Sequence, residues 1–189
     1  MIGLRQIIVA LLVLTSPGAF AAEVTAVDPA LRTALMRAVS DTKSFADRYD
    51  AEVWLTDMSQ RLSQRIPEPG YRLELLRYVH EEATRVELPP ELVLAVIDVE
   101  SNFDRFAISS AGARGLMQVM PFWLKEIGRP DDSLFRVQTN LRYGCTILKF
   151  YLEKEKGNLY QALARYNGSR GSRTYPGKVN TVWRSRWHP

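Results

Sequence analysis

Apolar residues recur at helical spacing along most of the chain. Trp54, Met58, Leu62 and Ile66 are spaced by four, so they form one stripe and predict a helix that ends before Pro67. No segment shows the sustained alternation of apolar and polar residues that is typical of strands, so the sequence predicts a mainly α fold. The same periodicity, bounded by proline and glycine, predicts further helices that begin at Asp28-Pro29 and that cover 70–86, 91–100, 116–127, 136–154, 158–166 and 178–187.

The predicted helix 91–100 has few polar positions and ends at a carboxylate. A helix that is apolar nearly all round is a buried helix. Glu100 closes it, and an ionised carboxylate that is buried costs several kcal/mol unless it is paired or neutralised. Burial would therefore raise the pKa of Glu100, which is the property that a general acid needs near neutral pH. The alternative is that Glu100, at the helix end, faces solvent.

The first 22 residues have the pattern of a secretory signal peptide. Arg5 precedes a short apolar run over 7–14, and Ala19-Phe20-Ala21 places small residues where a signal peptidase cleaves. The run is too short to span about 30 Å of hydrocarbon. The alternative is an uncleaved membrane anchor. We expect an exported, periplasmic protein with no transmembrane segment after cleavage.

Composition limits the class of protein and of site. The chain has 189 residues, 46% hydrophobic and 24% charged, which is typical of a globular protein and excludes fibrous and disordered classes. Its net charge of +4 favours an anionic partner without requiring nucleic acid. One cysteine, Cys145, excludes an intramolecular disulfide, and with only two histidines we expect no metal and no cofactor. Cys145 lies in an apolar run and is interpreted as a core residue.

Three short motifs, the first of which begins at Glu100 itself, change how this residue is interpreted. Glu100-Ser101 comes first, then Gly115-Leu116-Met117-Gln118 after a loop of small residues, and then Tyr166-Asn167 at a predicted helix end. Taken singly, Met117 and Met120 are more often core residues, and Tyr166 is typical of a half-buried tyrosine. In this order and spacing, the motifs resemble the lysozyme-like domain of the soluble (family 1) lytic murein transglycosylases.

The resemblance covers residues 86–189 and implies a lysozyme-like helical catalytic domain preceded by a helical N-terminal segment, 23–85. The segment that begins at Asn140 and contains Gly144 is similar to a connecting helix of that family, and Tyr175 to its late cleft tyrosine. One stretch departs from the family pattern Ala-Tyr-Asn-Ala-Gly-Pro. After Tyr166-Asn167 the glycine comes one place early and the proline is missing.

The resemblance also implies an activity. Such enzymes cleave the β-1,4 bond between N-acetylmuramic acid and N-acetylglucosamine in peptidoglycan and leave 1,6-anhydromuramic ends. Glu100 would act alone, first as general acid and then as base, whereas most glycosidases use two carboxylates. Asp98 points to a different helix face, and Asp104 is typical of a turn cap. The expected substrate-binding residues are Ser109, Met117, Gln118, Met120, Tyr166, Asn167 and Tyr175.

These residues have separate expected roles. Ser109 and Gln118 would contact sugars, whereas Met117 and Met120 would form an apolar floor beneath the sugar rings. Tyr166 would donate a hydrogen bond to Glu100 or to the substrate acetamido group. The basic tail after Glu155, with Trp183 and Trp187, is either a rim that holds anionic peptidoglycan or a solvated helix face with two packing tryptophans.

Two other functions remain open on the sequence alone. A hydrolytic muramidase would use the same acid with water as nucleophile. A non-catalytic peptidoglycan-binding scaffold protein would keep the groove without turnover. The expected partner is the peptidoglycan glycan strand, and the sequence does not identify a protein partner in the cell wall or in a secretion machine.

Overall fold

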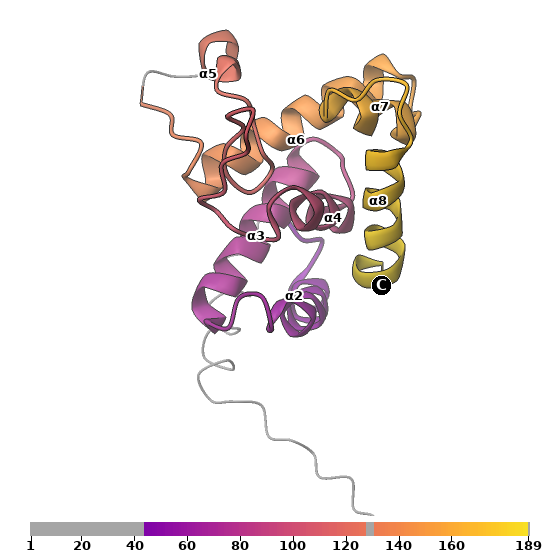
Figure 1. The fold of residues 1–189 in the computed structure, drawn as a ribbon. Helices are drawn as coiled ribbons and strands as arrows, with labels where there is room; N and C mark the ends of the chain where they lie inside the picture. The colour runs from indigo at the N-terminus through magenta and orange to yellow at the C-terminus, as the bar shows by residue number, and fades with distance from the viewer. Residues whose placement is uncertain (1–43, 128–130, 189) are drawn as a thin grey trace, which may run out of the picture.

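The computed structural model describes residues 44–127 and 131–188. The predicted signal peptide and the helix predicted from Asp28-Pro29 lie outside these residues. Within the described ranges the fold is helical, and the pairing of extended backbone is limited to two isolated β-bridges (Figure 1). The prediction of a mainly α fold is therefore confirmed. No helix in these ranges is both long and apolar enough to cross a membrane.

Most helix boundaries follow local signals in the sequence. Asp47 caps its helix by accepting hydrogen bonds from the backbone N–H groups of Tyr49 and Asp50. Pro69 and Pro90 occupy first-turn positions, where the missing N–H costs nothing. The helices are α2 (Arg48–Leu62), α3 (Pro69–Arg85), α4 (Pro90–Ser101), α5 (Phe122–Ile127), α6 (Val137–Lys154), α7 (Leu159–Tyr166) and α8 (Thr174–Val182), followed by the π-helical turn η1 (Trp183–Trp187).

The predicted helix 116–127 is wrong over its first half. Only α5 is helical there, and Gln118 has a left-handed backbone with φ of +48°. Arg114 and Val119 instead exchange two backbone hydrogen bonds of 3.0 Å, which closes a tight loop. Leu116, Met117 and Val119 still point into the core, so an irregular loop produces an apolar pattern like that of a helix. The last predicted helix also begins earlier than expected, at Thr174.

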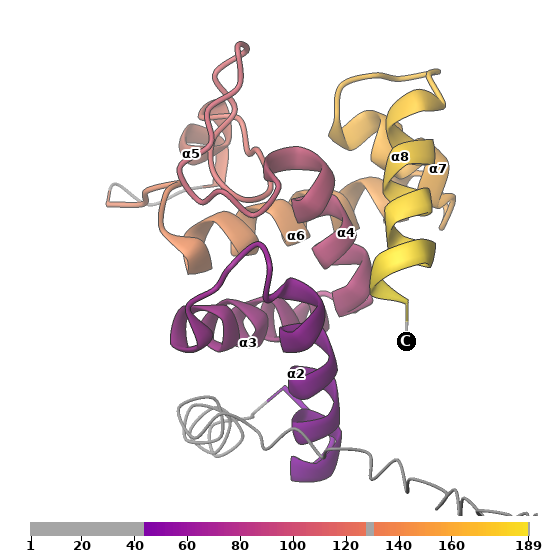
Figure 2. The same ribbon diagram turned by 60° about the horizontal axis from the view of Figure 1, so that its bottom comes forward.

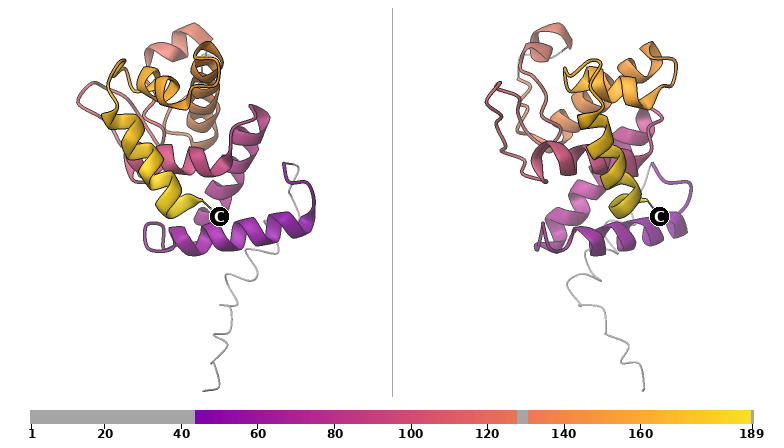
Figure 3. Two further views of the ribbon diagram at one scale, coloured as in Figure 1. Left: turned by 90° about the vertical axis from the view of Figure 1, so that its right-hand side faces the viewer. Right: turned by 45° about the vertical axis from the view of Figure 1, so that its right-hand side comes forward.

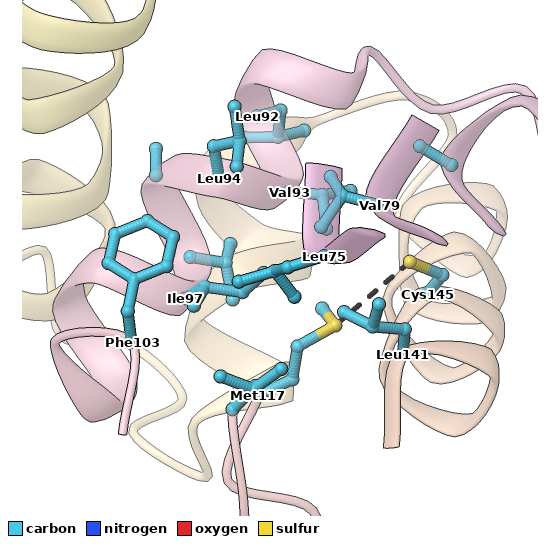
Figure 4. Close-up of a cluster of buried hydrophobic side chains, with 14 of the residues drawn as sticks. Leu75, Val79, Leu92, Val93, Leu94, Ile97, Phe103, Met117, Leu141 and Cys145 are labelled. Atoms are coloured by element: carbon cyan, nitrogen blue, oxygen red, sulfur yellow. Dashed lines mark hydrogen bonds between the residues drawn. The ribbon is translucent and has the colours of Figure 1, made fainter. Parts of the chain in front are cut away.

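Helix α4 is the centre of the molecule. Six consecutive residues, Leu92 to Ile97, are buried, as expected for a helix that is covered on every side. Figures 1 and 2 show α4 between the segment that leads to α5 on one side and α8 on the other, and Figure 4 shows its side chains meeting those of α3 and α6. The position of α4 carries Glu100, in its last turn, to the boundary between core and surface.

One hydrophobic core joins the helices on both sides of residue 86. It extends without a break from Leu55 of α2 to Trp187 of η1. Figure 3 shows α2 across the base of the molecule with the C-terminal turn close above it. The hydrogen bonds from Arg61 to the backbone carbonyls of Arg186 and His188 join these same elements. The division of the chain into 23–85 and 86–189 stays a prediction.

Candidate active site

Glu100 occupies the last turn of α4, at a point where the chain is tightly held. The neighbouring Ser101 hydroxyl donates hydrogen bonds to the backbone carbonyls of Ile97, at 3.1 Å, and Leu116, at 2.8 Å. Asn102 then ends the helix in the left-handed conformation, with φ of +49°. The helix end that carries the carboxylate is therefore fixed to the loop that follows Gly115.

The Glu100 side chain borders a cavity of about 330 Å³. Glu100 is the one acidic residue in the lining of this cavity, and most of the opposite wall comes from a single stretch of chain before and within α8. That wall is rich in hydroxyl and amide groups, with one ammonium group from Lys178. Its other polar residues are Asn167, Ser169, Ser172, Thr174 and Tyr175. The carboxylate thus faces a polar space of the kind that binds small polar ligands.

Tyr175 holds the carboxylate by a direct hydrogen bond. Its hydroxyl donates to Oε1 of Glu100 at 2.7 Å, and the tyrosine itself is 8% exposed. Burial raises the pKa of Glu100 to about 7, whereas this hydrogen bond favours the ionised form and opposes the rise. A pKa near 7 suits Glu100 to proton transfer near neutral pH, and the Tyr175 hydroxyl fixes the orientation of its carboxyl group.

Tyr166 has a different role from the one expected. Its hydroxyl donates to the backbone carbonyl of Met117 at 2.7 Å, not to Glu100. The expected hydrogen bond from Tyr166 to Glu100 is therefore wrong, because Tyr175 takes that position, whereas the alternative contact with the substrate acetamido group stays a prediction. Tyr166 lies at the end of α7 and ties this helix to the loop after Gly115.

Met117 is a core residue and not a floor beneath sugar rings. It is 0% exposed, and its sulfur lies 4.0 Å from the sulfur of Cys145 (Figure 4). A methyl group added at Gly144 would come within 2.4 Å of the Met117 sulfur, so Gly144 leaves room for this side chain. The predicted contact of Met117 with substrate is wrong, because the loop turns its side chain inward. Met120 is partly exposed and lies outside the cavity lining, so its role stays a prediction.

Gln118 and Ser109 both act within the loops that carry them. The Gln118 amide donates to the carbonyls of Gly115, at 2.9 Å, and Ala107, at 3.2 Å. The Ser109 hydroxyl accepts a hydrogen bond from the backbone N–H of Ala113. Both side chains are partly exposed and neither lines the Glu100 cavity, so their contact with sugars stays a prediction. Asn167 does line the cavity.

The side chain of Asn140 holds the loop around Gly115 in place, a role that was not expected from the sequence. Its side chain is fully buried, accepts from the Met117 N–H at 2.8 Å, and donates to the carbonyls of Arg114 and Leu134. A methyl group at Gly115 would lie 2.4 Å from the Asn140 amide nitrogen. A buried amide inside the apolar run 136–154 was the available signal. Lys178 and Ser169 were also missed as cavity residues, although Lys178 lies one helical turn after Tyr175.

The other acids near Glu100 have structural partners. Asp98 accepts hydrogen bonds from Arg186, at 2.7 Å, and from the indole N–H of Trp187, at 3.0 Å. Asp104 caps a turn by accepting from the Phe106 N–H. The turn cap at Asp104 is confirmed, Asp98 is occupied by its own partners, and the catalytic assignment depends on Glu100 alone.

The basic tail is only partly a free rim. Trp187 is 0% exposed and packs against Phe103, so this tryptophan belongs to the core. Arg186 pairs with Asp98, and Arg165 pairs with Glu155. In the described residues, no three His, Cys, Asp or Glu side chains come together as a candidate metal site.

The helical fold places one half-buried carboxyl, whose pKa is raised toward neutrality, at a cavity lined by polar groups. This arrangement defines a class of protein suited to acid–base chemistry on a polar ligand. Residues 77–181 match the model of the transglycosylase SLT domain, and the chain belongs to this family. The resemblance seen in the sequence motifs is thereby confirmed.

The curated relatives are longer proteins. The chain is 33% identical over 113 residues to the membrane-bound lytic murein transglycosylase C of Yersinia pestis (strain Pestoides F), and equally to that of Yersinia pseudotuberculosis (strain IP32953). These matches cover 51% of this chain and 32% of each relative, so the chain matches about a third of their length.

Two solved structures are also similar. An inactive mutant of the lytic transglycosylase Slt of Pseudomonas aeruginosa has a TM-score of 0.46 at 22% identity, covering 81% of this chain and 31% of that one. The 70 kDa soluble lytic transglycosylase of Escherichia coli has a TM-score of 0.45 at 24% identity, covering 82% and 23%.

Proposed function

We propose that this protein is a peptidoglycan lytic transglycosylase that cleaves the β-1,4 bond between N-acetylmuramic acid and N-acetylglucosamine. The observation that carries the proposal is Glu100, whose pKa is raised to about 7 beside a polar cavity and whose carboxyl group is held by Tyr175. Family membership and the printed names of the relatives support the same substrate class.

The mechanism uses one carboxyl group twice. Protonated Glu100 donates its proton to the glycosidic oxygen, and the bond from the anomeric carbon of muramic acid to that oxygen breaks. The carboxylate that remains then takes the proton from the muramic C6 hydroxyl. The C6 oxygen closes onto the anomeric carbon and forms the 1,6-anhydro ring, so Glu100 ends protonated and no water is consumed.

The surroundings of Glu100 support this cycle over hydrolysis by a pair of carboxylates. A two-carboxylate glycosidase needs a second acid across the scissile bond, about 5 to 10 Å from the first. Within the described residues, the wall facing Glu100 carries hydroxyl, amide and ammonium groups, and Asp98 is committed to Arg186 and Trp187. Developing positive charge on the sugar would then be stabilised by neutral polar groups and by the substrate's own acetamido group.

Substrate contacts follow from the same arrangement. Asn167 and Tyr175 line the cavity and would contact the sugar next to the scissile bond. Ser109, Gln118 and Met120 would act further along the glycan from the loops that carry them. The exported, periplasmic location inferred from residues 1–22 belongs to this proposal, because peptidoglycan lies outside the cytoplasm.

Product analysis tests the proposal directly. Purified peptidoglycan is digested with the wild-type chain, with Glu100→Gln and with the control Glu126→Gln, an exposed acid on α5, and the products are identified by mass spectrometry. We expect 1,6-anhydromuramic ends from wild type and control, and none from Glu100→Gln. Reducing ends would show a muramidase instead, and binding without cleavage by wild type would show a scaffold protein. Activity that survives in Glu100→Gln would overturn the catalytic assignment.

A further inference from the structure

Lys178 brings a positive charge to the cavity of Glu100, and the proposed reaction gives this charge no role. Lys178 lies on α8 three residues after Tyr175, so the two side chains share a helix face, and both line the cavity. Figure 2 shows α8 beside α4, the helix whose last turn carries Glu100. The lysine is therefore placed to contact whatever occupies the space next to the proposed acid.

The charge of Lys178 is open to a ligand. The residue is exposed, and within the described ranges no acidic side chain forms an ion pair with it. Other basic residues of the C-terminal tail are engaged elsewhere. Arg165 and Arg186 pair with acids, and the guanidinium of Arg173 lies over the Tyr160 ring, 5.6 Å from its centroid. Among the described residues, Lys178 is the one cation in the lining of the Glu100 cavity.

The proposed reaction makes this cavity cationic at the moment it begins. Glu100 must be protonated to act as the acid, and its pKa of about 7 keeps the proton on it up to the neutral range. In that state the described part of the lining carries one positive charge, from Lys178, and no negative charge. Such a cavity favours a substrate with an anionic group close to the bond that is broken.

Peptidoglycan carries an anionic group on one of its two sugars. N-acetylmuramic acid bears a lactyl group, whose carboxyl is either free or joined to a peptide stem that has carboxylates of its own. N-acetylglucosamine has no counterpart to this group. An ammonium group binds carboxylates by charge-assisted hydrogen bonds, and the flexible lysine side chain can reach a carboxylate in either position.

We propose that Lys178 determines substrate specificity by binding a carboxylate carried by the muramic residue next to the scissile bond. The carboxylate belongs either to the lactyl group itself or to the peptide stem attached to it. This inference rests on the proposed function and deepens it, because it names the part of the glycan that the cavity recognises. The cavity is then selective for charged muramic residues over neutral ones.

Binding to a chain that does not cleave its ligand tests this preference. The full chain with Glu100→Gln, which gives the cavity the same charge as a protonated acid, is titrated calorimetrically with tetrasaccharides of alternating N-acetylglucosamine and N-acetylmuramic acid. One pair of ligands has free lactyl carboxylates or their amides, and a second pair has peptide stems with free or amidated carboxylates. At low ionic strength we expect the carboxylate form to bind about fivefold more tightly in at least one pair. The pair that shows the preference identifies the source of the carboxylate.

Two second substitutions in the Glu100→Gln chain assign the preference to one residue. Lys178→Gln should lower affinity for the carboxylate form to that for the amide and leave the amide affinity unchanged, which also shows that the cavity is still folded. Lys156→Gln, at an exposed position outside the cavity lining, should keep the full preference. The proposal is overturned if neither ligand pair shows a preference, if the preference survives Lys178→Gln, or if that substitution weakens both forms equally.

These outcomes are separate from those that test the reaction. A preference that depends on Lys178, in a protein whose wild type leaves no 1,6-anhydromuramic ends, would refute the proposed reaction and support the binding site. Formation of these ends by wild type, together with a Lys178→Gln substitution that leaves the affinities unaltered, would refute the binding site and support the reaction.

Discussion

Tyr175 and Glu100 are 75 residues apart in the sequence and joined by a hydrogen bond of 2.7 Å. The tyrosine comes from α8 and the acid from the end of α4, and each is held by its own packing. The hydrogen bond stabilises the ionised carboxylate, while burial favours the protonated form. The balance of the two sets the proton affinity of the group that we propose to be the catalyst.

Removing this hydrogen bond should shift the activity profile upward in pH. In Tyr175→Phe the ionised form of Glu100 loses a donor, so its pKa rises above about 7 and the falling limb of the pH–rate curve moves to higher pH. We also expect kcat to fall about tenfold, because the acid loses its orientation. The profile of kcat/KM between pH 4 and 9 measures both. Tyr49→Phe, at a position 80% exposed, is the control.

The raised pKa of Glu100 also predicts the direction in which kcat/KM of the wild-type protein changes with pH. Because Glu100 must be protonated to donate, kcat/KM should fall as pH rises through about 7, tenfold for each further pH unit. Turnover of purified peptidoglycan in buffers of constant ionic strength measures this limb. A rate that is flat from pH 5 to 8 would contradict the role of Glu100 as the acid.

Glu100 should lower the free energy of unfolding at neutral pH. Its pKa is raised on folding, so the folded state holds its proton over a range where the unfolded chain has lost it, and stability falls as pH rises from about 4.5 to 7. Glu100→Gln should therefore be about 3 kcal/mol more stable than wild type at pH 8 and equal to it near pH 4. Urea unfolding at the two pH values checks this, and the same difference at both would contradict it.

Close packing at Gly144 predicts a sharp difference between two glycines. Gly144→Ala drives a methyl group against Met117, so we expect a loss of about 1–3 kcal/mol. Gly177 lies within α8 with open space around its Cβ position, so Gly177→Ala should be neutral or up to about 1 kcal/mol stabilising. Thermal unfolding of the two variants side by side measures the contrast, and equal effects would mean that Met117 moves aside freely.

Asn140 should be as important for activity as for stability. Asn140→Leu keeps the approximate volume but leaves the Met117 N–H and the carbonyls of Arg114 and Leu134 without their partner. We expect a loss of about 2–4 kcal/mol and a loop that no longer holds Ser101 and the end of α4. Urea unfolding and peptidoglycan turnover are measured together. Wild-type stability together with wild-type turnover would show that the loop keeps its structure without Asn140.

The sequence predicted most helices and the candidate acid. Its predictions were wrong where the structure depends on contacts between distant parts of the chain. Periodicity and proline positions sufficed for α2, α3, α4, α6 and α7, because each has an apolar face and a local boundary signal. The loop at Gly115 was interpreted as a helix, because buried residues in an irregular loop mimic a helical pattern. Tyr166 and Tyr175 are both tyrosines near helix ends, so which of them reaches Glu100 depends on how α7 and α8 pack.

The C-terminal turn has a consequence for the order of folding. Asp98, two residues before Glu100, is anchored by the indole of Trp187, 89 positions further along the chain. During synthesis, the helix with the acid emerges from the ribosome well before the turn that braces it. Contacts between such distant positions are slow to form. The surroundings of Glu100 are therefore completed among the last events of assembly. A nascent chain that lacks residue 187 has no indole to hold Asp98, which Arg65 alone of its partners can then reach.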